Sequence, residues 1–124
     1  MIGIVYLGNN EQTQNLLKYI PGKMVKYTST YKDAATVCTT TLKDEHFILF
    51  YERSVRNEDI TAIKYIRKKC PNIYLILMTG PMKKEDRTMY QKCGIDDTMT
   101  STSTIFDINN KVTFISDREE LFFG

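Results

Sequence analysis

Apolar runs separated by amphipathic segments are the feature that most constrains the fold of this chain. Three runs are continuously apolar, at residues 2–7 (IGIVYL), 47–51 (FILFY) and 73–79 (IYLILMT), whereas those at 24–28 (MVKYT) and 96–100 (DDTMT) are more polar. A continuously apolar strand indicates burial on both faces, so we place the first three at the centre of a parallel sheet and the other two at its edges. The alternation predicts an α/β domain with helices on both faces of the sheet.

The connecting segments carry helical spacing and helix-ending signals, and we expect helices over residues 9–20, 31–42, 57–69 and 83–93. Either Asn9 or Asn10 is suited to cap the first of them, because a short polar side chain accepts a hydrogen bond from the exposed N–H groups. The fourth closes on Gly94, and we expect Met89 and Tyr90 to form its buried side.

Residues 103–116 are open to two interpretations. Four apolar side chains share one helical face: Ile105, Ile108, Val112 and Ile115. The pair Asn109-Asn110 would also serve as the two-residue turn of a β-hairpin. We favour the helix, because a layered fold needs cover on that side of the sheet.

Length and charge limit the class of protein. The 124 residues fit one domain, and a net charge of +2 is too small to indicate nucleic-acid binding. No run is long enough to span a membrane, and the first ten residues lack the features of a signal peptide, so we expect a cytoplasmic chain.

The cysteines and the single histidine do not indicate a reactive site. Cys38, Cys70 and Cys93 are odd in number and widely spaced, which argues against a disulfide framework and a zinc site. We interpret them as small buried side chains or exposed thiols. His46 has no evident partner for a triad or a metal site, so we expect it to pack at the surface or at the sheet edge.

The order and size of these elements resemble the receiver domain of two-component response regulators, the CheY-like family. The segment ILFYERSVRNEDITAIKYIRKKCPNIYLILMTG (48–80) is similar to the family's third strand, active-site loop, third helix and fourth strand. The segment MYQKCGIDD (89–97) matches the approach to its fifth strand. The resemblance implies a flavodoxin-like three-layer α/β/α sandwich whose parallel five-stranded sheet has the order 2-1-3-4-5, with residues 1–124 as a single receiver-like domain.

Carried over position by position, the resemblance shows what the chain lacks. The family's acidic pair, which holds Mg²⁺, falls on Gly8 and Asn9, and its phospho-acceptor aspartate falls on Tyr51. The lysine that contacts the phosphoryl group falls on Ser101, whereas the hydroxyl residue after the fourth strand is kept as Thr79.

These replacements predict that the phosphorylation chemistry is lost. Aspartyl phosphorylation needs a carboxylate and a divalent cation held by further carboxylates, and a phenol with an ordinary pKa of about 10 is a poor substitute. We therefore expect no magnesium or other cofactor and no enzymatic activity from this domain. We expect the Tyr51 ring to fill the former phosphorylation pocket, with its hydroxyl directed toward solvent or Thr79.

Two weaker hypotheses concern the same edge of the sheet. Glu52 would become the phospho-acceptor if the third strand slipped by one residue, but such a slip would turn the whole strand inside out. Lys83 or Lys84, together with Thr79, could hold a visiting anion, although a basic start of a helix is more often simply solvated.

The resemblance predicts a pseudo-receiver of a bacterial signalling protein, acting through a protein partner or as a homodimer. In the family the pairing surface is formed by the fourth helix, fifth strand and fifth helix, here residues 83–93 and 103–116, and Thr98 replaces the aromatic switch residue.

An alternative is that the chain is the N-terminal regulatory domain of a larger enzyme, for example a membrane sugar-phosphate transferase. We expect Phe122 and Phe123 in REELFFG to be exposed, which would favour a following segment.

Overall fold

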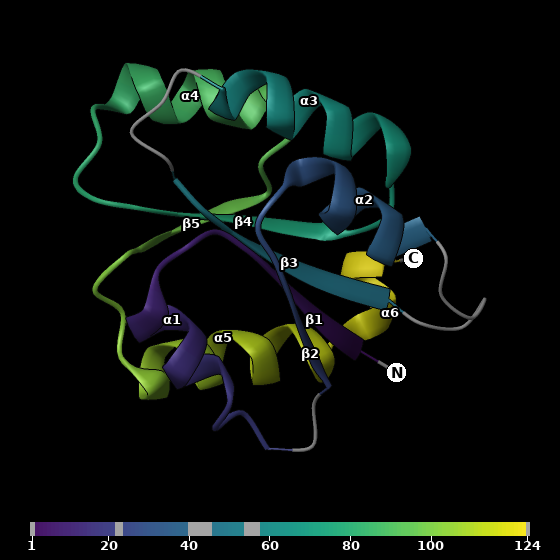
Figure 1. The fold of residues 1–124 in the computed structure, drawn as a ribbon, viewed down its shortest axis with the longest axis vertical. Coiled ribbons are helices and arrows are strands. Elements are labelled where there is room, and N and C mark those ends of the chain that lie inside the picture. The colour runs from purple at the N-terminus through teal and green to yellow at the C-terminus, as the bar shows by residue number, and fades with distance from the viewer. Residues whose placement is uncertain (1, 22–23, 40–45, 54–57, 124) are drawn as a thin grey trace.

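A parallel five-stranded sheet of order β2-β1-β3-β4-β5 forms the centre of the protein (Figure 1). The computed structural model describes residues 2–21, 24–39, 46–53 and 58–123. The strands are β1 (Ile2–Leu7), β2 (Val25–Thr28), β3 (His46–Glu52), β4 (Tyr74–Thr79) and β5 (Asp97–Thr100). The helices are α1 (Glu11–Leu17), α2 (Tyr31–Thr39), α3 (Asp59–Lys69), α4 (Lys84–Cys93), α5 (Ile105–Ser116) and α6 (Glu119–Phe123). The predicted strand order and fold class are confirmed.

Helices cover both faces of the sheet and divide the core into two clusters of buried side chains. On one face α2, α3 and α4 pack against alternate residues of β1, β3 and β4; on the other, α1 and α5 do so, with α6 at their side (Figure 1). Consecutive side chains of a strand point to opposite faces, so a central strand needs apolar residues at every position. This explains why the three continuously apolar runs form β1, β3 and β4.

Local signals explain most of the helix ends. Asn10 is the cap of α1, and its side-chain oxygen accepts hydrogen bonds from the N–H groups of Gln12 and Thr13. Gly94 ends α4 with φ 129°, as the sequence predicted. The predicted burial of Met89 is wrong, because Met89 is 41% exposed whereas Tyr90 is 4% exposed. Tyr90 is the only residue of α4 that is buried.

The segment after β5 is a helix, and the hairpin alternative is wrong. Thr104 and Asp107 form a reciprocal capping box, in which each side chain accepts a hydrogen bond from the other residue's N–H. Ile108, Val112 and Ile115 are buried beneath the sheet, as the spacing predicted. The Asn109-Asn110 pair lies inside α5, where the buried face outweighs its turn preference.

The predicted exposure of Phe122 and Phe123 is wrong, because both side chains are half-buried in α6. The Phe123 ring stacks on His46, with 4.6 Å between centroids, and the Phe122 ring meets Tyr74 edge-on at 5.2 Å. His46 Nδ1 also lies 2.9 Å from Glu119 Oε1, and His46 packs at the surface, which is one of the two predicted placements; the sheet edge is excluded because β3 is the central strand. The exposure argument for a following segment therefore does not hold.

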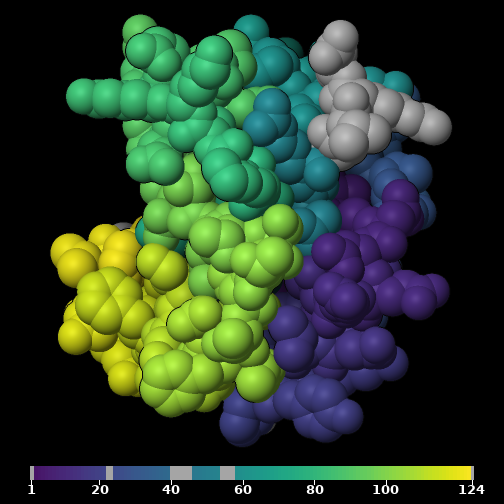
Figure 2. Space-filling view, turned by 90° about the vertical axis from the view of Figure 1, so that its left-hand side faces the viewer, coloured from purple at the N-terminus to yellow at the C-terminus, as the bar shows by residue number. Residues whose placement is uncertain are grey.

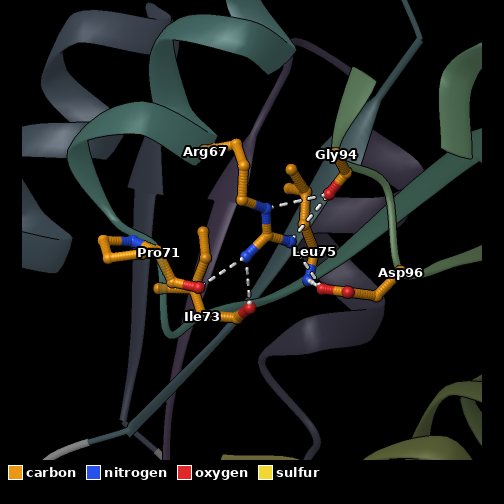
Figure 3. Close-up of polar contacts among 6 residues, drawn as sticks. All are labelled: Arg67, Pro71, Ile73, Leu75, Gly94 and Asp96. Carbon is orange, nitrogen blue, oxygen red and sulfur yellow. Dashed lines mark hydrogen bonds and ion pairs between the residues drawn. The ribbon is translucent and has the colours of Figure 1, made fainter. Parts of the chain in front are cut away.

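Arg67 at the end of α3 joins three segments by five hydrogen bonds (Figure 3). Its guanidinium donates to the carbonyls of Pro71, Ile73 and Gly94, at distances from 2.7 to 3.1 Å. It also donates to Asp96 Oδ2 at 2.6 Å, and the same oxygen accepts the Leu75 N–H at 2.8 Å. The five N–H donors of the guanidinium match five acceptor contacts, which fixes the starts of β4 and β5 relative to α3.

The cysteines are all free thiols, with Cys70 buried and Cys38 and Cys93 half-buried. Within the described residues, no three side chains of His, Cys, Asp or Glu gather in a way that could hold a metal ion. No helix of the described chain has the length and apolar character to cross a membrane.

Candidate functional site

A cleft of about 1380 Å³ opens at the carboxyl ends of the strands, where α/β sheets of this order bind their ligands. Figure 2 shows this side of the molecule, where the segments after β1 (purple), β4 (green) and β5 (light green) meet. All five predicted pocket positions line the cleft: Gly8, Asn9, Tyr51, Thr79 and Ser101. Lys83 and Lys84 are exposed and are not among the described lining residues, so the predicted anion contacts gain no support.

Tyr51, the residue at the family's acceptor position, is 5% exposed and fills the floor of the cleft. Its hydroxyl donates a hydrogen bond of 2.7 Å to Asp59 Oδ1 at the start of α3. Burial, this hydrogen bond and the carboxylate charge raise the pKa of Tyr51 far above its usual value. The ring position follows the prediction, but the predicted direction of the hydroxyl, toward solvent or Thr79, is wrong.

Asp59 was not identified from the sequence as part of the site. In the sequence, Glu58 and Asp59 stand at the start of the predicted helix over residues 57–69, where the helix dipole favours negative charge without a specific partner. The observed burial of Asp59, at 4% exposure, distinguishes it from an ordinary acidic residue in the first turn of a helix. The structure therefore places a buried carboxylate in the cleft, at the start of α3.

Arg53 connects this carboxylate to the threonine after β4. Its Nε lies 3.7 Å from Asp59 Oδ2, and its Nη1 donates a long hydrogen bond of 3.4 Å to Thr79 Oγ1. Its guanidinium carbon lies 5.4 Å from the centre of the Tyr90 ring, within the range of a cation–π contact. The cleft therefore already contains a positive group that faces the buried carboxylate.

Glu52 points to the opposite face of β3 from Tyr51. Its Oε1 accepts hydrogen bonds from Thr13 Oγ1 at 2.7 Å and from the Tyr6 hydroxyl at 3.4 Å. The Tyr6 oxygen in turn accepts the Asn10 N–H at 3.0 Å. Partial burial raises the pKa of Glu52, and the two hydrogen bonds partly offset that rise. Glu52 thus holds β3 to β1 and α1.

Gly8 is required by the close approach of Glu52 and Tyr6. A Cβ atom at Gly8 would lie 2.5 Å from Glu52 Cβ and 2.7 Å from the Tyr6 hydroxyl oxygen, closer than carbon atoms in proteins approach. Its φ of 155° is also unfavourable for residues with side chains. With Glu52 and Tyr6 in these positions, no carboxylate side chain fits at the first position of the acidic pair.

The residues present do not fit a magnesium ion. Three carboxylates line the cleft, from Glu52, Glu58 and Asp59, but in the described part of the chain they do not gather into a metal-binding group. The Glu52 carboxylate is bonded to Thr13 and Tyr6, and the Asp59 carboxylate faces Tyr51 and Arg53. Mg²⁺ requires several oxygen ligands around one point, and these side chains do not provide them.

Comparison with known proteins finds similarity in structure alone. No protein-family model matches the chain, and no curated protein matches it in sequence.

Among solved structures, a two-component response regulator from Clostridium difficile is 16% identical with a TM-score of 0.77, over 96% of this chain and 98% of that one. A putative pilus assembly protein from Burkholderia thailandensis is 13% identical with a TM-score of 0.74, over 94% and 99%.

A third similar structure holds the metal that receivers use. The receiver domain of a sensor histidine kinase from Pseudomonas aeruginosa, with a magnesium ion in its active-site cleft, is 14% identical with a TM-score of 0.70, over 90% of this chain and 94% of that one. Identities this low establish the architecture and not the chemistry. The chain therefore has the flavodoxin-like fold of receiver domains.

Proposed function

We propose that this chain is a pseudo-receiver, a receiver-like module that takes no phosphoryl group and acts by binding a protein partner or a second copy of itself. The observation that carries the proposal is the Tyr51–Asp59 hydrogen bond at the acceptor position. Because of this bond, the side chain at the end of β3 is engaged in a buried contact within the protein. The receiver fold, which generally serves regulation, supports the same conclusion.

Tyr51 is a poor nucleophile in this setting. Its phenol must lose a proton before it can attack phosphorus, and the pKa of Tyr51 is raised by burial and by the Asp59 carboxylate. The Asp59 carboxylate that accepts the Tyr51 hydrogen bond also faces Arg53, 3.7 Å away. The described side chains of the cleft do not gather the ligands of a metal ion, which would otherwise stabilise the transferring group.

Glu52 is also a poor acceptor. Its carboxylate is held on the opposite face of β3, where Thr13 and Tyr6 donate to it. Tyr51 pairs with both Leu7 on β1 and Leu77 on β4, so it lies between two neighbouring strands. This pairing supports the alignment that puts Tyr51, not Glu52, at the acceptor position. We therefore keep weak phosphorylation of Glu52 only as an outcome that the following experiment would detect.

Incubation with Mg²⁺ and acetyl phosphate, followed by intact-mass measurement, tests the absence of phosphorylation. We expect no added phosphoryl group, and no spectral change around Thr79 on addition of beryllofluoride, because neither Tyr51 nor Glu52 offers a free carboxylate beside a metal. A receiver with an intact acidic pair serves as the positive control. A mass increment that disappears in Glu52→Gln would contradict the proposal and establish the atypical acceptor.

The proposed interaction surface is the α4–β5–α5 face. It includes two exposed apolar side chains on the helices that flank β5: Met89 on α4 and Phe106 on α5, which is 71% exposed. Lys111 on α5 pairs with Asp97 on β5 at 2.6 Å, so the helix and the edge strand form a connected surface. Exposed apolar residues beside charged ones are typical of reversible protein contacts.

Sedimentation over a range of concentrations tests the face in self-association, with Phe106→Ser as the test variant. Tyr19→Ser is the matched control, because Tyr19 is a comparably exposed aromatic residue, at 75%, that follows α1 and does not belong to α4, β5 or α5. We expect Phe106→Ser to weaken dimer formation and Tyr19→Ser to leave it unchanged. Equal effects of the two variants would show that a different surface is used.

A further inference from the structure

The ends of α2 and α3 bring two thiols together. Cys38 lies in the last turn of α2, and Cys70 caps the C-terminus of α3. Both helices lie side by side on the same face of the sheet (Figure 1). The Cys70 thiol donates to the Ala35 carbonyl at 3.5 Å, one turn before Cys38, so its sulfur reaches the turn of α2 that carries the second thiol.

The two thiols lie in one cluster and differ in accessibility. Cys70 is a buried member of the core cluster against which Cys38 packs, and the neighbouring Cys38 thiol lowers the pKa of Cys70. The positive charge of Arg67 also favours the Cys70 thiolate. Cys70 is 4% exposed, whereas Cys38 is half-buried, so a reagent in solution meets Cys38 first.

We propose that Cys38 and Cys70 are a redox site that forms a reversible intramolecular disulfide with low-molecular-weight disulfides as oxidants. The Cys38 sulfur attacks one sulfur of the oxidant and forms a mixed disulfide as the S–S bond of the oxidant breaks. The Cys38 proton passes to the other half, which leaves as a thiol. The Cys70 thiolate then attacks the Cys38 sulfur, forms the Cys38–Cys70 bond and releases the second half as a thiol. Two protein thiols are oxidised, and one disulfide molecule is reduced to two thiols.

The bond would couple the redox state to the packing of the α2–α3 layer. Reduced, the two helix ends are held by the contact of the Cys70 thiol with the Ala35 carbonyl. Oxidised, they are covalently joined, and the loop between residues 38 and 70, which contains β3, is closed. Closing a loop restricts the unfolded chain, so the oxidised form is expected to melt at the higher temperature.

Oxidation of the folded protein with glutathione disulfide, followed by peptide mapping, tests the proposal. We expect loss of two of the three thiols, one linked peptide that contains Cys38 and Cys70, and full recovery of the thiols with dithiothreitol. Circular dichroism recorded during the reaction verifies that the chain stays folded while the bond forms. The melting midpoint should rise on oxidation and return on reduction.

The three cysteines offer matched variants. Cys93→Ser removes a half-buried thiol outside the pair, and on oxidation this variant should still lose its two remaining thiols together. The Cys38→Ser variant should form no intramolecular disulfide. Mapping of the wild-type chain does not depend on any variant folding correctly. A folded wild-type protein that keeps its thiols, stops at mixed disulfides or links Cys93 would overturn the proposal.

Discussion

Replacement of Arg67 by alanine is the perturbation whose effect the structure specifies best. The side chain donates five hydrogen bonds, to three carbonyl oxygens and one carboxylate, and these acceptors belong to the segments that begin β4 and β5. No smaller side chain reaches all of them. Truncation removes the whole set at once and leaves the acceptors to find water or to remain unpaired.

The size of the effect follows from the burial of these contacts. The bonds to Gly94 and Ile73 are partly buried, and at about 1 kcal/mol each these three bonds contribute about 3 kcal/mol. The bond to Pro71 is exposed and the Asp96 pair is a quarter to a third exposed, so together they add about 1 kcal/mol. The expected loss is about 4 kcal/mol, a large part of the roughly 5–15 kcal/mol typical of a domain.

Urea unfolding, followed by circular dichroism, measures this loss. Lys68→Ala is the matched control, because it removes one positive charge from the same turn of α3 but its side chain is exposed, and we expect it to cost less than about 0.5 kcal/mol. Arg67→Lys keeps the positive charge but lacks the planar guanidinium with its several donors. Its loss of unfolding free energy should lie between those of Arg67→Ala and Lys68→Ala. If Arg67→Ala costs no more than Lys68→Ala, the contacts in Figure 3 do not contribute to stability, and the reasoning is refuted.

Three further predictions concern the cleft. Tyr51→Phe removes the donor to the buried Asp59 carboxylate and should lower the unfolding free energy by about 1–2 kcal/mol in urea, whereas an unchanged value would mean that the contact is not stabilising. Because the pKa of Glu52 is raised in the fold, its contribution to stability is complete below the unfolded pKa and declines as pH rises through the folded pKa. Glu52→Gln should therefore gain more stability relative to wild type at pH 7 than at pH 4 in paired urea titrations, and the reverse order would contradict this sign. Gly8→Ala should cost about 2 kcal/mol or more in thermal melts, since its methyl group overlaps Glu52 and Tyr6, and a neutral result would show that these side chains move aside easily.

The sequence was sufficient to predict the sheet, because a central strand is buried on both faces and therefore has apolar side chains along its whole length. Residues 47–51 and 73–78 have only aliphatic, aromatic or methionine side chains, as a strand covered on both faces requires. The helix at 103–116 was less certain, since Asn109-Asn110 has a turn preference of its own. Packing of Ile108, Val112 and Ile115 against the sheet determined the outcome, and that contact lies outside any local window.

The contacts of single polar residues could not be predicted in the same way. The helical pattern placed Arg67 at the end of α3, where its charge already had an explanation in the helix dipole. Its five bonds depend on where the segments before β4 and β5 lie in space. The same holds for Asp59, whose contact depends on how far the Tyr51 side chain reaches from β3.

The replacements in the cleft depend on one another. Tyr51 needs an acceptor for its buried hydroxyl, and Asp59 supplies it; the Asp59 carboxylate needs a nearby positive charge, and Arg53 supplies it where a receiver would use a metal ion. On the other face of β3, Glu52 occupies the space that a side chain at Gly8 would need. Restoring a single acidic residue would leave these other constraints in place. The cleft residues thus form a connected set of internal contacts, and this set is the physical basis of the proposal that the module binds a partner and takes no phosphoryl group.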